Sequence, residues 1–120
     1  MMSLIAIALL AGQTAWRNGD AIRVSGTATI EDAFLSSDSY NTFKRWDPSR
    51  ANAWDALTER CARSRGYGDF WSHMLVAEGA VDIAVEPSVT LWDLAASYVI
   101  VEAAGGRFTD LAGKPGPDGG

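Results

Sequence analysis

The sequence predicts an α/β fold in which a layered mixed sheet is flanked by helices. In the second half of the chain, segments with helical spacing of apolar residues alternate with short apolar runs, as in layered α/β proteins. The 120 residues are 48% apolar and 21% charged, close to the average of soluble globular proteins. This composition excludes a disordered tail, a collagen-like repeat and a polytopic membrane protein. The length suits a single domain, 1–120.

Residues 1–14 are an apolar start that admits more than one interpretation. The run Leu4–Ala11 is shorter than the roughly 20 residues that cross a bilayer. It is similar to the apolar part of a signal peptide, but no Lys or Arg precedes Arg17, so a buried strand or the broken start of a longer protein is favoured. Asn18-Gly19 then predicts a hairpin turn, with Ala21–Ser25 as its second strand.

The middle of the chain is expected to hold one strand and one helix. Ala33–Ser37 predicts a short strand. Asp38–Asn52 is rich in Ser, Asn and Asp and contains Pro48, so we expect mostly loop, with helical turns as an alternative. In Ala53–Arg63, apolar residues recur three and four positions apart, which predicts an amphipathic helix.

Five further elements alternate along the second half. They are a strand or loop at Ser64–Gly68, a helix from about Asp69 to Gly79, a strand at Val81–Val85, a helix from Thr90 to about Ala104 and a last strand at Arg107–Leu111. Glycines are placed to end both helices. Residues 112–120 are expected to form a flexible tail.

Charge and cysteine content restrict the partners. The formal charge of −5 argues against binding a phosphate backbone, which needs clustered Lys and Arg, and is compatible with carboxylates collected around a cation. Cys61 is the only cysteine, so an internal disulfide is excluded and a reducing compartment is favoured. We therefore expect a cytoplasmic protein that binds neither nucleic acid nor membrane.

Asp93 is the first candidate for a functional carboxylate, and two interpretations stay open. Thr90 and Asp93 have the spacing of a capping box, and an acid in the first turn also suits the helix dipole. Alternatively, a carboxylate held beside the bulky Trp92 is a ligand that hard divalent cations prefer. One carboxylate does not make a metal site, so partners are needed.

Several ordered motifs around Asp93 resemble those of the inositol monophosphatase-like phosphatases. Residues 92–96 (W-D-L-A-A) and 99–106 (V-I-V-E-A-A-G-G) are similar to the family's C-terminal W-D and E-A-G-G signature, with one added alanine. Residues 77–82 (A-E-G-A-V-D) resemble its A-x-G-x-x-D step, and Glu86 falls where the family places an acid. Residues 65–71 (R-G-Y-G-D-F-W) resemble the histidinol-phosphatase branch.

The resemblance implies hydrolysis of phosphate monoesters with two or three Mg²⁺ ions. It assigns Asp93 as a catalytic residue that ligates Mg²⁺, and Glu86 as a contact for substrate hydroxyls or the substrate amine. Gly68 and Asp69 match a loop-to-helix junction that lines the substrate pocket. Asp69 replaces a small residue, and a carboxylate suits the amine of L-histidinol phosphate better than the neutral ring of an inositol phosphate.

The other metal-binding motifs of that family, G-E-E and D-P-x-D-G-T, are missing from the 120 residues. Asp47-Pro48 is followed by Ser49-Arg50 and does not match the second motif. The sequence therefore predicts a truncated C-terminal α/β domain: the substrate-binding half of a Mg²⁺-dependent phosphomonoesterase, inactive alone. Histidinol-phosphate phosphatase is preferred; an inositol- or sugar-phosphate phosphatase and a non-catalytic α/β fragment stay as alternatives. Because surfaces that pack against a missing half would be exposed, a homo-oligomer is expected.

The remaining reactive residues favour structural interpretations. His73 is expected to be a partly buried helix residue, and Cys61 a small core residue. The tryptophans on predicted helices are expected to be core anchors first: Trp54, Trp71 and Trp92. The basic residues near the middle of the chain are expected to form a solvated face: Arg45, Arg50, Arg60, Arg63 and Arg65.

Overall fold

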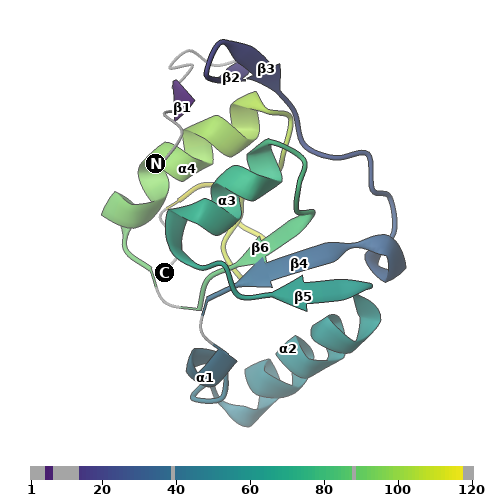
Figure 1. Ribbon diagram of the computed structural model, residues 1–120. Coiled ribbons are helices and arrows are strands. Elements are labelled where there is room, and N and C mark those ends of the chain that lie inside the picture. The colour runs from purple at the N-terminus through teal and green to yellow at the C-terminus, as the bar shows by residue number, and fades with distance from the viewer. Residues whose placement is uncertain (1–4, 7–13, 39, 88, 118–120) are drawn as a thin grey trace.

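The computed structural model describes residues 5–6, 14–38, 40–87 and 89–117 (Figure 1). The elements in chain order are β1 (Ile5–Ala6), β2 (Ala15–Arg17), β3 (Asp20–Ile22), the 3₁₀ turn η1 (Ile30–Asp32), β4 (Phe34–Ser37), α1 (Tyr40–Phe43), α2 (Pro48–Arg60), β5 (Arg63–Arg65), α3 (Asp69–Ala77), β6 (Ile83–Val85) and α4 (Leu91–Ala103). None of the helices described is both long and apolar enough to cross a membrane.

The central sheet has the strand order β5-β4-β6, and both pairs are parallel. Leu35 in β4 lies opposite Ser64 in β5 and Ile83 in β6. The connection from β4 to β5 runs through α2 on one face, whereas α3 and α4 lie on the other face (Figure 1). The predicted α/β class, with a layered sheet flanked by helices, is confirmed.

Two apolar clusters lie on opposite faces of this sheet. Beneath it, Leu35, Phe43 and Trp54 are buried, and the Phe43 and Trp54 rings stack with centroids 3.8 Å apart. The cluster above it joins α3, α4 and the hairpin, and its buried members are Ala15, Ile22, Met74, Ala77, Leu94, Ile100, Val101, Ala104 and Phe108. Burial on both faces is what a parallel sheet requires. The interpretation of Trp54 as a core anchor is confirmed.

The predicted hairpin is confirmed between β2 and β3, which pair antiparallel. Asn18 and Gly19 both have positive φ, 50° and 87°, as a two-residue turn of this type requires. β3 ends at Ile22, three residues before the predicted end. Of the apolar run Leu4–Ala11, only β1 lies within the described residues, and it pairs with β2 as a strand.

The expectation of mostly loop at Asp38–Asn52 is wrong, and its alternative of helical turns is confirmed, since α1 and the start of α2 lie within this segment. α2 begins at Pro48, five residues before the predicted start, because Asp47 caps it. The Asp47 carboxylate accepts hydrogen bonds from the N–H groups of Ser49 (3.1 Å) and Arg50 (3.2 Å). Proline at the first helical position is pre-set for a helix. Asp47-Pro48 is therefore a helix start.

The predicted last strand at Arg107–Leu111 is also wrong. In this segment the structure has one isolated bridge, between Thr109 and Pro115, and no ladder. The Asp110 carboxylate accepts hydrogen bonds from the N–H groups of Ala112 (2.9 Å) and Lys114 (2.8 Å). These local bonds hold the chain in a turn, since Asp side chains compete with strand pairing for backbone donors.

Candidate functional site

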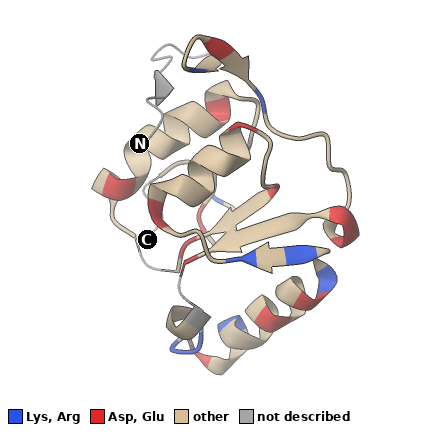
Figure 2. Ribbon diagram, in the orientation of Figure 1, with Lys and Arg blue, Asp and Glu red and all other residues tan. Residues whose placement is uncertain are grey.

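The carboxyl ends of the three parallel strands bring the predicted site residues together. Asp38 follows β4, the Gly68-Asp69 pair follows β5 by a short loop, and Glu86 directly follows β6. In Figure 2 the strands point toward the same side as the starts of α3 and α4, where acidic residues are coloured red. Ligands of open α/β sheets bind at this edge, next to the strand where the order reverses, here β4.

A cavity of about 430 Å³ lies at this edge and is lined by four carboxylates. Its lining residues are Asp38, Asp69, Phe70, His73, Glu86, Val89, Asp93 and Leu94. The structure thus joins three predicted site residues, Asp69, Glu86 and Asp93, in one place. We call this the acidic cavity.

Asp38 is a member of the acidic cavity that the sequence interpretation missed. Asp38 begins the expected loop Asp38–Asn52 and comes directly after the predicted strand Ala33–Ser37. A carboxylate at the end of a buried strand was the signal available. Its neighbours in the cavity lie 31 or more positions away in the chain, so only the parallel pairing of β4 with β5 and β6 reveals them.

Gly68 and Asp69 form the junction between β5 and α3. Gly68 has φ 72° and ψ 168°, a combination that is essentially restricted to glycine, and Asp69 has φ 50°. The Gly68 N–H donates to the Ser37 carbonyl at 3.1 Å, which holds the junction against the end of β4. A Cβ at Gly68 would lie 3.6 Å from a carboxylate oxygen of Asp38. Asp69 lines the cavity, whereas Gly68 is not among the lining residues and lies behind Asp38 and Asp69.

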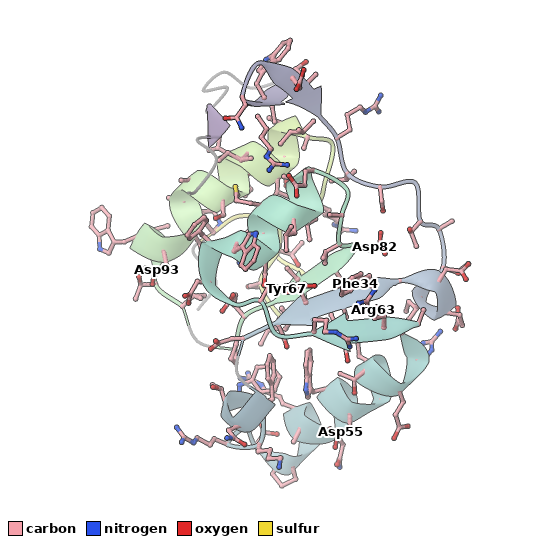
Figure 3. All side chains as sticks on the ribbon, viewed as in Figure 1. Phe34, Asp55, Arg63, Tyr67, Asp82 and Asp93 are labelled. Atoms are coloured by element: carbon pink, nitrogen blue, oxygen red, sulfur yellow. The ribbon has the colours of Figure 1, made fainter. Side chains whose placement is uncertain are left out.

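Asp93 forms the predicted capping box of α4. Its Oδ2 accepts hydrogen bonds from the Thr90 hydroxyl at 2.8 Å and from the Thr90 N–H at 3.3 Å. Figure 3 shows Asp93 at the start of α4. These bonds hold the carboxylate at the mouth of the cavity, so the structural role and a role toward a ligand are compatible in one side chain.

Glu86 and His73 are the buried lining residues of the acidic cavity, and both also line a neighbouring cavity. Their side chains are 8% and 9% exposed, and Glu86 Oε1 lies 4.0 Å from His73 Nε2. Burial, together with the charges of Asp38, Asp69 and Asp93, raises the pKa of Glu86 to about 7. Burial lowers the pKa of His73 to about 4, so its imidazole is neutral at pH 7. His73 is more buried than predicted, and it has a facing group that its sequence context did not reveal.

The described residues do not by themselves form a metal site. No three His, Cys, Asp or Glu side chains in the part of the chain that the structure describes lie close enough to hold a metal ion together. The four carboxylates supply the type of oxygen that Mg²⁺ prefers, but no three of them surround one position where an ion could bind. A Mg²⁺ ion at Asp93 would need ligands from outside these residues.

Asp82, another acid of the second half, belongs to the scaffold. It lies at the start of β6, at the end of the sheet away from Asp93 (Figure 3). Its carboxylate accepts hydrogen bonds from the Phe34 N–H at 2.7 Å and from the Ser25 hydroxyl. Asp82 therefore ties β6 to β4.

Two tryptophan interpretations are wrong. Trp71 is 53% exposed and Trp92 is 90% exposed, and neither lines the acidic cavity. Trp71 packs on the ring of Tyr67, on the side of α3 away from the core, and Trp92 stands in the first turn of α4. Aromatic residues on a helix are core anchors only on its packed face.

The remaining candidates have structural surroundings. Arg60 pairs with Glu31 at 2.9 Å, and Arg63 lies over the Phe34 ring at 4.8 Å, on the face shown in Figure 3. Arg65 donates to the Ser64 carbonyl at 2.7 Å. Cys61 packs beside the lower cluster, and burial raises the pKa of its thiol. The interpretation of the arginines as a solvated face agrees with their exposure, whereas that of Cys61 as a core residue is wrong, since it is half-buried at the edge of the cluster.

The sequence of the chain matches a known protein family and known phosphatases. A model of the inositol monophosphatase family matches residues 6–119. Histidinol-phosphatase of Streptomyces coelicolor is 45% identical over 100 residues, covering 82% of this chain and 36% of that protein. Histidinol-phosphatase of Mycobacterium tuberculosis is 48% identical over 99 residues, covering 82% and 37%.

A solved structure agrees with this match. An IMPase from Thermotoga maritima superposes with a TM-score of 0.75 at 34% identity, covering 88% of this chain and 40% of that one. The chain thus spans between a third and a half of the length of each of these three relatives.

Proposed function

The chain belongs to the inositol monophosphatase family, and we propose that it is the C-terminal, substrate-binding part of a Mg²⁺-dependent phosphomonoesterase that acts on L-histidinol phosphate. The observation that carries this proposal is the acidic cavity. Four carboxylates line it: Asp38, Asp69, Glu86 and Asp93. Like charges gathered in one cavity repel one another unless a cation joins them, and an amine-bearing substrate supplies that cation.

The raised pKa of Glu86 supports the same ligand class. Part of that rise comes from Asp38, Asp69 and Asp93, so the charges of these three side chains favour a protonated Glu86. A bound ammonium group would favour the ionised form and relieve the repulsion among all four carboxylates. The neutral hydroxyls of an inositol ring do not supply this electrostatic attraction. The cavity therefore supports an amino alcohol phosphate over the inositol phosphate alternative.

The phosphate is expected at the mouth of the cavity, near the starts of α3 and α4. Helix N-termini present unpaired N–H groups and a partial positive charge to anions. Mg²⁺, when bound, would polarise the phosphoryl oxygens and activate a water. Asp93 is the residue of this chain that we propose as a ligand. Because the described residues do not complete such a site, we derive no step through the metal.

The 120-residue chain is expected to be inactive alone, because one candidate ligand cannot hold two Mg²⁺ ions. The test compares Mg²⁺-dependent phosphate release from L-histidinol phosphate by the chain and by the full-length Mycobacterium tuberculosis relative. We expect release by the relative only. A rate from the chain near that of the relative would contradict the expected inactivity.

Binding tests the substrate class without requiring turnover. Titration calorimetry with L-histidinol phosphate and with myo-inositol 1-phosphate would compare the chain, Asp69→Ala and the matched control Asp55→Ala. Asp55 is an exposed acid on α2, far from the cavity (Figure 3). Asp69→Ala is expected to weaken L-histidinol phosphate about tenfold, a typical loss for one charged contact, with little effect on the inositol ligand. Equal losses for both ligands would count against the proposed substrate.

We also propose that the chain self-associates and works in the cytoplasm. Large apolar side chains are exposed around the starts of α3 and α4: Tyr67, Phe70, Trp71, Leu91 and Trp92. Exposed apolar patches drive association. Light scattering that shows a stable monomer at high concentration would remove the basis for the homo-oligomer.

A further inference from the structure

Two buried polar atoms face each other in the lining of the acidic cavity. His73 Nε2 and Glu86 Oε1 have no hydrogen-bond partner among the described residues, and they lie 4.0 Å apart. Buried polar atoms of folded proteins almost always have a partner. A gap of this size is closed by a small side-chain rotation or by one bridging water, and no other described group is paired with either atom.

Among the described residues that line the acidic cavity, His73 carries the one side-chain donor available to Glu86; a neighbouring cavity that both residues also line contains Arg107 and Thr109. Of the described residues that line the cavity, the other polar side chains are the carboxylates Asp38, Asp69 and Asp93, which accept hydrogen bonds when ionised. Their charges repel the Glu86 carboxylate. A neutral imidazole donates from one nitrogen, so a proton on Nε2 directs that donor at Oε1.

The imidazole ring is held in place by its surroundings. His73 lies on α3, and its ring packs against the Phe108 ring with centroids 5.2 Å apart. Glu86 follows β6 directly and precedes Pro87, whose ring restricts the backbone before it. The donor and the acceptor therefore come from two elements that pack on each other.

We infer that His73 is a positioning residue for Glu86: its Nε2–H donates to Oε1 and turns Oε2 toward the ligand in the acidic cavity. The inference rests on the proposed function, because the ligand that it serves is the amine of L-histidinol phosphate. In this proposal His73 acts on the ligand through Glu86: it sets the direction of the carboxylate that contacts the ligand, and it compensates part of the repulsion from the three neighbouring acids.

The first test reads the hydrogen bond directly, because His73 is the only histidine of the chain. Long-range ¹H–¹⁵N NMR at pH 7 reports which ring nitrogen carries the proton. We expect the Nε2–H tautomer in the wild-type chain, retention of that tautomer in Glu86→Gln, and a shift toward a tautomer mixture in Glu86→Ala. The control Glu59→Ala removes an exposed acid on α2 and should leave the spectrum unchanged. A proton on Nδ1, or a tautomer that is indifferent to Glu86→Ala, would overturn the inference.

The second test separates positioning from a merely structural role. His73→Leu removes the donor and His73→Gln retains one. Calorimetry should show L-histidinol phosphate weakened about tenfold by His73→Leu and largely restored by His73→Gln, the loss expected for one misdirected charged contact, while myo-inositol 1-phosphate changes little. Equal losses for both ligands would overturn the inference. If the wild-type chain binds neither ligand, the proposed function fails, and the NMR experiment alone decides the role of His73.

Discussion

Replacing Glu86 by glutamine is expected to stabilise the chain at alkaline pH, although it removes a candidate site residue. The side chain is buried beside three other acids, and its pKa is raised from 4.5 to about 7. Ionising it in the folded state therefore costs more than ionising it in the unfolded state. Glutamine keeps the shape and a carbonyl acceptor for His73, but it cannot ionise.

The sign of the pH dependence follows from which state holds the proton. Between pH 4.5 and 7 the unfolded chain has lost the Glu86 proton, whereas the folded chain keeps it. The contribution of Glu86 to the free energy of unfolding is thus fully present below pH 4.5 and falls by about 1.4 kcal/mol for each pH unit up to 7. Above pH 7 the accumulated loss is about 3 kcal/mol by the same relation, and Glu86→Gln should recover it.

His73 opposes this trend over part of the range. Burial lowers its pKa from 6.5 to about 4, so between these values the unfolded chain holds a proton that the folded chain lacks. Its contribution to the free energy of unfolding therefore rises with pH, while that of Glu86 falls. The wild-type curve should be nearly flat between pH 4.5 and 6.5 and decline only above it, whereas Glu86→Gln should rise through that interval.

Urea unfolding at several pH values between 4.5 and 8 measures both effects. The difference between Glu86→Gln and wild type should be near zero at pH 4.5 and about 3 kcal/mol at pH 8. Glu59→Gln makes the same chemical change on the exposed side of α2 and should follow the wild-type curve. Parallel wild-type and Glu86→Gln curves at all pH values would refute the reasoning, because they would mean that Glu86 ionises as easily in the folded state as in the unfolded state.

Two further substitutions test the scaffold by urea unfolding followed by circular dichroism. Gly68→Ala should lower the free energy of unfolding by about 1–3 kcal/mol, because alanine is forced into a positive φ. The control Gly26→Ala, whose Cβ would point into open space, should change the free energy of unfolding by less than about 0.5 kcal/mol. Equal effects would contradict this account of the junction. Trp54→Ala should lower the free energy of unfolding by about 3–5 kcal/mol, because it leaves a cavity beside Leu35 and Phe43. Trp92→Ala should lower it by less than about 0.5 kcal/mol, because the ring is exposed. A large loss for Trp92→Ala would contradict the exposed position of this side chain.

Structural features that depend only on residues close together in the sequence were predictable. The Asn18-Gly19 turn and the Thr90–Asp93 capping box depend on residues at most three positions apart, and both are confirmed. The failures were local too, where a side chain competes for backbone donors. Asp47 starts a helix inside an expected loop, and Asp110 holds a turn where a strand was expected. A short polar side chain can cap a helix or hold a turn. Which of the two it does depends on the backbone N–H groups that lie within its reach.

The acidic cavity was predictable only in part, because it is a product of topology. Asp69, Glu86 and Asp93 were named from motifs, but the sequence did not show that Asp38 completes the set. That result depends on β4 standing between β5 and β6 with all three strands parallel, so that residues from distant segments end at one edge. The same arrangement explains the His73–Glu86 pair, since α3 crosses from β5 to β6 and carries His73 over the end of β6.

The observed capping role of Asp93 is compatible with the ligand-binding role that we propose for it. A carboxylate that accepts two hydrogen bonds from Thr90 has lost the rotational freedom that binding a cation would otherwise remove. The helix start that favours the acid also places it at the mouth of the cavity. If Asp93 binds a ligand as proposed, the capping box preorganises that carboxylate. On this argument, removing the Thr90 hydroxyl weakens ligand binding through Asp93 as well as the start of α4.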